Sequence, residues 1–196
     1  MDEEGIARRF LEAVETHGVI LVHDKALPSI TAVAAGEPVA GSWWSHPLAN
    51  SIYNALGAIE HDVLEVRLIR SKVTLVAQHL WPAIVAIGSG RSDWQLRHLP
   101  SEAIALLASI EDGASAVAVD ASLKRLLRGM AERLLVFGID VHTPIGRHEK
   151  RYSSWSSWAE EHDVAVGLAD EEGRRLVETA ITSWPSGGTT TGLLPW

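Results

Sequence analysis

The chain has 196 residues, of which 46% are apolar and 21% charged, a balance typical of a globular protein that can bury a real core. It contains no cysteine, which excludes disulfides and thiolate-bound zinc or iron–sulfur centres. The formal charge of −8 argues against binding of nucleic acid over the whole surface. Because the start, Met-Asp-Glu-Glu, lacks the regions of a secretory signal and no apolar run reaches the roughly 20 residues of a membrane helix, we expect a soluble cytoplasmic protein without membrane contact.

The first half of the sequence predicts helices followed by a β-hairpin. Apolar residues at helical spacing predict a helix over 2–16, and a short apolar run predicts a strand over 19–22. Further helices are expected over 27–35, closed by Gly36, and from Ser45 to about Glu60. Two alternating runs over 64–68 and 73–77 form the hairpin. The apolar run over 79–87 fits a helix or a strand, and we favour a helix that Gly88-Ser89-Gly90 ends.

The second half repeats this order. A helix is expected over 100–112, with Ile104, Leu107 and Ala108 facing inward and Gly113 ending it. A short strand around Val117 and Val119 precedes a helix that Asp120 caps. A hairpin follows, then helical residues over 156–162. The last helix begins at Asp170 and places the following residues on one face: Leu176, Val177, Ala180, Ile181 and Trp184.

The stretch from Asp120 to Trp155 carries the clearest chemical signal. Its helix has one apolar stripe, continued by Leu134, and a basic face opposite. The period then changes to two, Thr143-Pro144-Ile145-Gly146 supplies a turn, and the returning strand is polar and basic. From Asp120 to Arg151 there are seven Lys/Arg against four Asp/Glu, an excess of positive charge inside an acidic chain.

A basic helix followed by a basic-tipped hairpin resembles the recognition helix and wing of the winged-helix (winged helix-turn-helix) superfamily. The repeated element order implies a helix-rich α+β fold with two short antiparallel hairpins. It also implies two winged-helix-like units in tandem, over 1–90 and 91–185, followed by a flexible tail over 186–196. So few residues separate Gly113 from Asp120 that the second helix of this fold is short or missing in the second unit.

The resemblance implies a non-catalytic protein that binds DNA. Cationic side chains neutralise phosphates and release counterions, and arginine can pair with guanine edges in the major groove. The residues expected to make this contact are Lys124, Arg125, Arg128, Arg147, Lys150 and Arg151.

Other functions remain open. The same cations could form a solvated helix face and a charged hairpin that discourages edge pairing. The chain would then be an interaction or scaffold module, with a protein partner or a second copy of itself, or a small-molecule-binding protein. The first half favours this alternative, since its corresponding helix exposes Asn50, Ser51 and Asn54 but no Lys or Arg.

Catalysis has little support. The tandem layout is similar to that of bacterial alkylpurine DNA glycosylases, which depend on Gln-x-Gln or Gln-x-Asp, whereas Gln78 and Gln95 stand alone. There is no Gly-x-Ser-x-Gly elbow, and Gly88-Ser89-Gly90 lacks the spacing of a dinucleotide loop. We therefore predict no catalytic residue and no cofactor.

A metal site was considered at the hairpin. Asp140 and His142 would share one side of a strand, with His148 across the turn, and this set could hold zinc or iron. A polar hairpin tip is the commoner explanation, so we predict no metal. The eight tryptophans are expected mainly to seal a small core, and stacking on bases would require solvent exposure.

Overall fold

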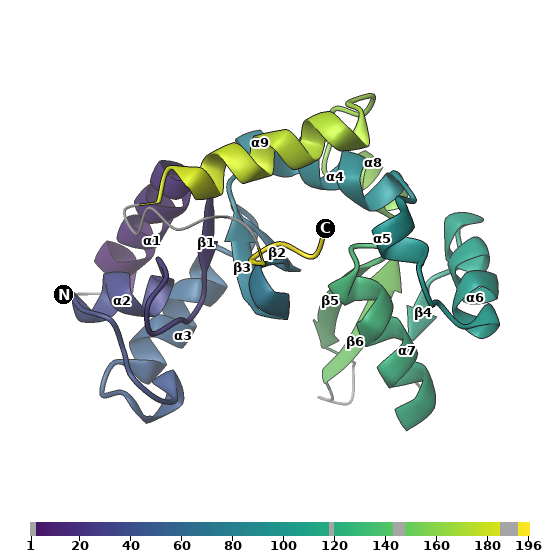
Figure 1. The fold of residues 1–196 in the computed structure, drawn as a ribbon. Helices are drawn as coiled ribbons and strands as arrows, with labels where there is room; N and C mark the ends of the chain where they lie inside the picture. The colour runs from purple at the N-terminus through teal and green to yellow at the C-terminus, as the bar shows by residue number, and fades with distance from the viewer. Residues whose placement is uncertain (1–2, 118–119, 143–147, 185–191) are drawn as a thin grey trace. The chain divides into compact units, whose positions relative to one another are not determined.

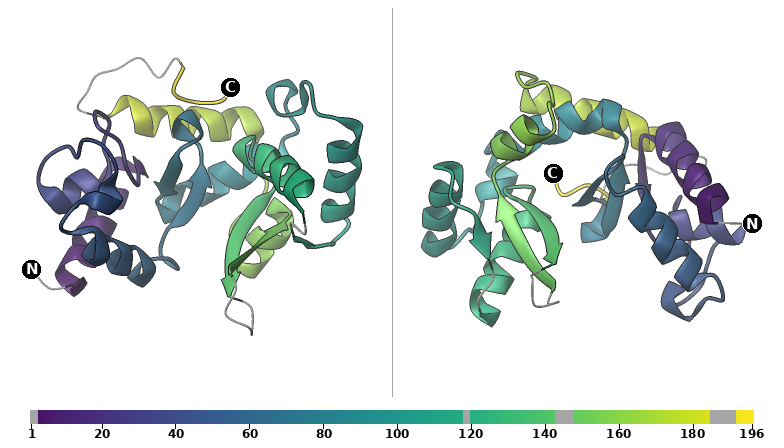
Figure 2. Two further views of the ribbon diagram at one scale, coloured as in Figure 1. Left: turned by 90° about the horizontal axis from the view of Figure 1, so that it is seen from below. Right: turned by 180° about the vertical axis from the view of Figure 1, so that it is seen from behind.

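The computed structural model describes residues 3–117, 120–142, 148–184 and 192–196, with only the backbone described for 140–142 and 148. Contacts divide the chain into two compact units. The first unit is Met1–Trp81 with Arg175–Pro195, and the second unit is Pro82–Arg174 with Trp196. Each combines helices with a three-stranded antiparallel sheet (Figures 1 and 2), which confirms the predicted helix-rich α+β class.

The first unit begins with helix α1 (Glu3–His17) and strand β1 (Val19–Leu21), followed by a short helix α2 (Ile30–Ala35). A single 3₁₀ turn (Trp43–Ser45) precedes α3 (Ala49–Ala58), and strands β2 (Leu64–Arg67) and β3 (Val73–Val76) complete the sheet. The strand order is β1-β3-β2, so β3 lies between the other two. The predicted hairpin is therefore the β2–β3 pair of a sheet whose third strand comes from before α2.

Local chemistry explains where α2 begins and ends. The Ser29 hydroxyl accepts a hydrogen bond from the Ala32 N–H, which caps the start of the helix. Gly36 has a φ of 80°, and its N–H donates to the Ala32 carbonyl. A left-handed residue at this position suits glycine, so the helix stops there.

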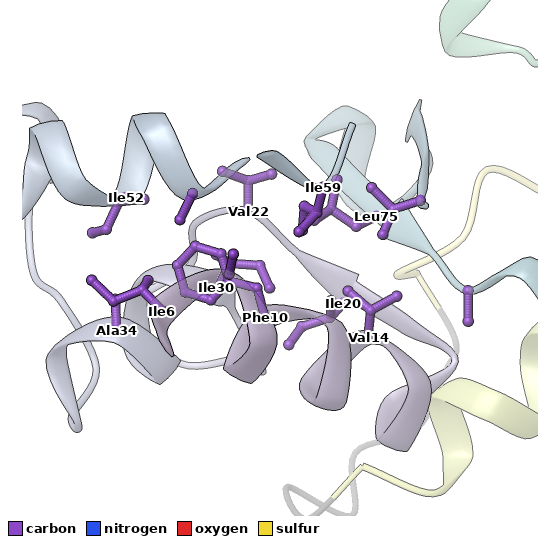
Figure 3. Close-up of a cluster of buried hydrophobic side chains, with 14 residues drawn as sticks. Ile6, Phe10, Val14, Ile20, Val22, Ile30, Ala34, Ile52, Ile59 and Leu75 are labelled. Carbon is purple, nitrogen blue, oxygen red and sulfur yellow. The ribbon is translucent and has the colours of Figure 1, made fainter. Parts of the chain in front are cut away.

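The core of the first unit forms where α1 meets α3 and the sheet. Ile6, Phe10 and Val14 recur along one side of α1 and point toward apolar residues of the other elements (Figure 3). Those partners are Ile20, Ile30, Ile52, Ile59 and Leu75. The C-terminal residues of α9 (Asp170–Thr182) also belong to this unit, and the Trp184 Nε1 donates to the Val19 carbonyl at 3.2 Å.

The second unit contains α4 (Trp81–Ser89), which confirms the helix favoured over 79–87, and a short α5 (Asp93–Leu96). Helix α6 (Ser101–Glu111), strand β4 (Ala116–Val117) and helix α7 (Ala121–Glu132) follow. Strands β5 (Phe137–His142) and β6 (His148–Ser153) form the predicted hairpin, and α8 (Trp155–Glu161) comes next. The strand order is β4-β6-β5.

The two sheets share one connectivity. In both, the first strand pairs with the third, and the second strand lies on the other side of the third. A helix precedes the first strand and another precedes the hairpin. The units differ in the segment between the first strand and the helix before the hairpin. In the first unit, α2 lies between β1 and α3, whereas in the second unit β4 ends at Val117 and α7 begins at Ala121. Only three positions of the sequence separate β4 from α7.

Two predicted helix faces need correction. In α6, Leu107 is buried as expected, but Ile104 is 54% exposed and Ala108 is also exposed. The buried partners of Leu107 are Ala103 and Ile110, which lie four residues before it and three after. Helix α6 is apolar on several sides, so its periodicity does not define a single inner face. In α9, Leu176 lies at the edge of the apolar face and is 37% exposed.

Candidate functional site

Helix α7 forms where the sequence supplies a cap and one apolar stripe. The Asp120 carboxylate accepts a hydrogen bond from the Leu123 N–H at 2.8 Å, which confirms the predicted cap. Leu127 and Met130 are fully buried against α6 and the sheet. The opposite side of the helix, here called the basic face of α7, exposes Lys124, Arg125 and Arg128.

One of these three cations is already paired. The Arg128 Nε donates to the Glu132 carboxylate at 2.8 Å, one helical turn later. The hydrogen bond from Arg128 to Glu132, and then the charge of that carboxylate, raise the pKa of Arg128. Within the described part of the chain, neither Lys124 nor Arg125 forms an ion pair. These two exposed side chains are therefore available to an anionic partner.

The hairpin separates its two described cations. In β6, Tyr152 lies opposite Gly138 and Arg151 lies opposite Ile139. Because side chains alternate along a strand, Lys150 shares the face of Tyr152, and Arg151 projects from the other face. Tyr152 packs in the core with Leu127 and Met130, so its face is the one covered by the helices.

Gly138 makes room for this arrangement. A Cβ at this position would lie 2.6 Å from the Tyr152 ring and 3.2 Å from the Lys150 Cε. The aromatic ring and the aliphatic part of the Lys150 side chain thus pack directly on the Gly138 backbone.

The basic face of α7 gathers three of the predicted contact residues on one helix. Lys150 lies on the sheet face that α7 covers, Arg151 lies on the opposite face, and Arg147 lies outside the described residues.

The helix that precedes the hairpin of the first unit is not basic. Helix α3 has no charged residue, and its exposed Asn54 donates to the Glu3 carboxylate at 2.7 Å. Two of the three cations at the hairpin bond within the unit: the Arg67 guanidinium donates to the Ser71 carbonyl at 3.1 Å, and Lys72 pairs with Asp24, whereas Arg70 is exposed. The contrast predicted from the sequence between the two halves is therefore visible in the contacts of their side chains.

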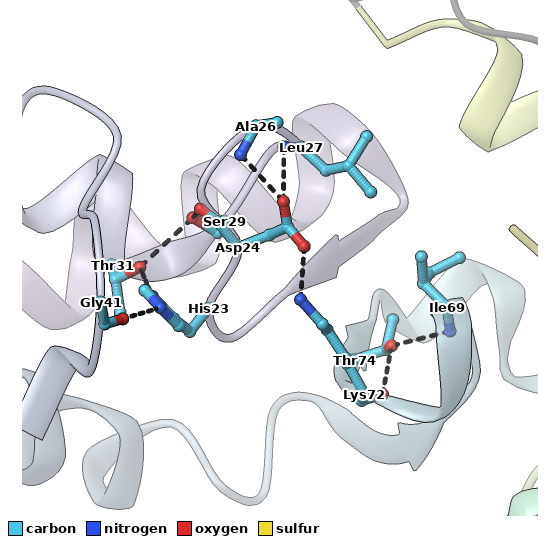
Figure 4. Close-up of polar contacts among 10 residues, drawn as sticks. All are labelled: His23, Asp24, Ala26, Leu27, Ser29, Thr31, Gly41, Ile69, Lys72 and Thr74. Carbon is cyan, nitrogen blue, oxygen red and sulfur yellow. Dashed lines mark hydrogen bonds and ion pairs between the residues drawn. The ribbon is translucent and has the colours of Figure 1, made fainter.

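A polar cluster that the sequence did not suggest surrounds Asp24 (Figure 4). The buried Asp24 carboxylate accepts from the Ala26 and Leu27 N–H groups at 2.8 and 3.0 Å and from the Lys72 Nζ at 2.7 Å. Burial by itself would raise the pKa of Asp24, but the Lys72 hydrogen bond, the Leu27 and Ala26 N–H groups and the Lys72 charge lower it to about 2. The carboxylate is fully satisfied, so it organises the loop after β1.

The neighbouring His23 is linked to this cluster through the hydroxyls of Thr31 and Ser29, which lie 3.3 Å apart. Its Nδ1 lies 2.9 Å from the Thr31 hydroxyl, and its Nε2 lies 2.8 Å from the Gly41 carbonyl (Figure 4). Because a carbonyl only accepts, Nε2 carries a proton. Both ring nitrogens are occupied in joining α2 to the residues after it, which is a structural arrangement.

Gln95 is a second buried polar residue whose role was not predicted. Its Nε2 donates to the Ile87 and Arg133 carbonyls at 3.1 and 3.0 Å, and its Oε1 accepts from the Ser92 N–H at 2.9 Å. The Arg133 guanidinium in turn donates to the Gln95 carbonyl at 2.9 Å. The capping pattern Ser92-x-x-Gln95 is the signal in the sequence that could have indicated this role. The residue connects α4, α5 and the end of α7.

Among the described residues, no group of three His, Asp or Glu side chains is arranged to hold a metal ion. The considered set Asp140, His142 and His148 lies outside the described side chains. No helix in the described ranges is both long and apolar enough to cross a membrane.

Four of the eight tryptophans are buried in a core. Trp155 and Trp158 are buried and contact the Phe137 ring, each with centroids 5.4 Å apart. Trp81 and Trp184 are also buried. Trp44 differs, because 60% of its surface is exposed.

Comparison with known proteins does not extend this description. No family model, no curated protein and no solved structure matches the chain.

Proposed function

We propose that the protein binds DNA without catalysis, through the basic face of α7, as a tandem winged-helix-like protein. The element order supports the proposal. The first unit follows the sequence α1-β1-α2-α3-β2-β3, with strand order β1-β3-β2, and the second follows α6-β4-α7-β5-β6. In a winged-helix protein the helix just before the hairpin is the recognition helix, and the hairpin is the wing. Those are α7 and the β5–β6 pair in the second unit.

The observation that carries the proposal is the segregation of charge on α7. Its inner side is closed by Leu127 and Met130, while Lys124 and Arg125 reach solvent without an acidic partner among the described residues. Arg128 follows Lys124 by four residues and Arg125 by three, the spacings that make side chains neighbours on a helix surface, so the three cations can contact one phosphate backbone. Arg151 projects from the opposite face of the hairpin, so the contact surface proposed here is the basic face of α7 alone.

Fluorescence anisotropy with a labelled DNA duplex tests the proposal. We expect salt-sensitive binding at micromolar protein, and a loss of at least tenfold in affinity for the double variant Arg125→Glu/Arg128→Glu. The matched control is Arg8→Glu in α1, because Arg8 is also an exposed helical arginine with an acidic partner one turn away, at 3.8 Å. Equal binding by the double variant and this control would reject α7 as the contact surface.

A protein-interaction role is the second candidate, and one observation favours it. The first unit exposes large aromatic side chains beside α3, a helix with no Lys or Arg. A polyanion has no counter-charge on that helix, whereas a protein partner can use aromatic contacts of this kind.

A further inference from the structure

Three aromatic side chains form a continuous group next to α3. The rings of Trp43 and Trp44 are stacked, with centroids 4.0 Å apart and planes at 26°. The Tyr53 ring, from the middle of α3, lies 5.9 Å from Trp44 at 45°. We call these three residues the aromatic platform.

The platform is anchored on one side and open on the other. Trp43 is half-buried and packs against the core of the first unit. Trp44 and Tyr53 are 60% and 57% exposed, in contrast to the buried Trp81 and Trp184 of the same unit. Single exposed apolar residues are ordinary, but two adjacent aromatic rings supported by a third form a recognition surface.

The charges around the platform favour a cation. Helix α3 has no charged residue, and Asn54, next to Tyr53, is bonded to the Glu3 carboxylate at 2.7 Å. Glu4 adds a second carboxylate to the same first turn of α1. The Glu3 carboxylate, held by the residue that follows Tyr53, is therefore a source of long-range attraction for a guanidinium or ammonium that approaches the rings.

From this combination of exposed rings and nearby carboxylates, we infer that the aromatic platform binds an arginine or lysine side chain of a basic peptide segment in a partner protein. A cation is attracted to the electron-rich face of an aromatic ring, most strongly to tryptophan, and the planar guanidinium also stacks on it. Glu3 supplies the long-range attraction, and Trp44 and Tyr53 supply the contact. The inference concerns a different unit from the DNA-binding proposal and does not depend on it.

The test titrates the full chain into a fluorescein-labelled Gly-Arg repeat peptide, with a Gly-Glu peptide of equal length and labelled single-stranded oligo-dT as comparisons. We expect the arginine peptide alone to bind in a way that depends on Trp44. Trp44→Ala and Tyr53→Ala should each weaken binding at least fivefold, and Trp44→Phe should retain most of it. Glu3→Gln should weaken binding less and reduce its salt dependence.

The matched control is Ile104→Ala, because Ile104 is an equally exposed apolar side chain, 54% accessible, in the second unit. Circular dichroism of every variant checks that the fold is retained. The acidic chain could attract a basic peptide without any site, and in that case Trp44→Ala would bind as tightly as the wild type, which would overturn the inference. Absence of binding, or Trp44-dependent binding of oligo-dT or of the acidic peptide, would overturn it as well.

Discussion

The Lys72 ammonium lies 2.7 Å from the Asp24 carboxylate, and this pair joins the loop after β1 to the turn before β3. Only 5% of the Asp24 side chain is exposed, against 47% of the Lys72 side chain. The carboxylate depends on its three donors, because water reaches little of it. This contact has consequences for stability at low pH.

We predict a loss of stability in acid that depends on Asp24. The pKa of Asp24 is about 2 in the folded state, below its ordinary value of 3.8. A lowered pKa stabilises the fold above pH 4, and this contribution, about 2 kcal/mol at most, disappears as the pH falls toward 2. Urea titrations at a series of pH values measure it.

Lys72→Gln should lower the free energy of unfolding at pH 7 and flatten the pH dependence between 4 and 2. The matched control is Lys25→Gln, since Lys25 is exposed on the loop that carries Asp24 and forms no ion pair among the described residues. If Lys72→Gln and wild type lose stability in parallel over this range, the pair does not set the pKa of Asp24.

Removal of the side-chain amide should destabilise the protein far more at Gln95 than at Gln78, the other glutamine of the chain. Gln95→Leu removes the side-chain partner of the Arg133 carbonyl and of the Ser92 N–H in a buried site, whereas the Ile87 carbonyl keeps the Gly90 N–H. We expect a cost of about 2–4 kcal/mol. Gln78 is exposed, so Gln78→Leu should cost less than about 0.5 kcal/mol. Chemical denaturation of both variants measures the difference. Similar costs for the two would mean that the Gln95 bonds contribute little.

A pair of glycine substitutions tests the packing of the second unit. A Cβ at Gly88 in α4 would lie 2.3 Å from the buried Trp155 indole, whose Nε1 donates to the Leu134 carbonyl. We expect Gly88→Ala to cost about 2 kcal/mol or more, because the indole cannot move without losing this bond. Gly129→Ala in α7 meets nothing within 4 Å and should stabilise the helix by roughly 0.5–1 kcal/mol. Thermal unfolding of the two variants should therefore shift in opposite directions.

Removing the acidic partner of Arg128 should strengthen DNA binding. Glu132→Gln breaks the ion pair and takes a negative charge from the basic face of α7, so we expect an affinity gain of about two- to fivefold at low salt. Glu12→Gln removes the corresponding partner of Arg8 in α1 and should leave the affinity unchanged. Equal effects of the two variants would point to net charge alone as the cause.

Much of the fold could be predicted because its signals are local. The Asp120 cap, the Gly36 stop and the two alternating hairpins each depend on residues a few positions apart. The pairing of β1 with β3 and of β4 with β6 could not be predicted. Nothing near Val19 or Ala116 specifies a partner strand so distant in the sequence. The inner face of α6 was missed for a related reason: with apolar residues on several sides, only its neighbours decide which side is buried.

The candidate site was predictable in part. The Asp120 cap and the apolar stripe of the helix together identify the basic face of α7. The opposite orientations of Lys150 and Arg151 were also within reach, since two neighbours on a strand always point to opposite faces. The Asp24–Lys72 pair was not, because 48 residues separate its members. The exposure of Trp44 likewise depends on the tertiary packing of Trp43 beneath it.

The salt dependence of DNA binding tests the central proposal most directly. Anisotropy titrations of one duplex between about 50 and 200 mM salt give the slope of log affinity against log salt, which changes by about 0.9 for each phosphate contact. We predict a clear negative slope for the wild type, reduced by about two for Lys124→Gln/Arg125→Gln. An absence of binding, or a slope that this variant leaves unchanged, would contradict the assignment of α7 as the DNA-binding surface.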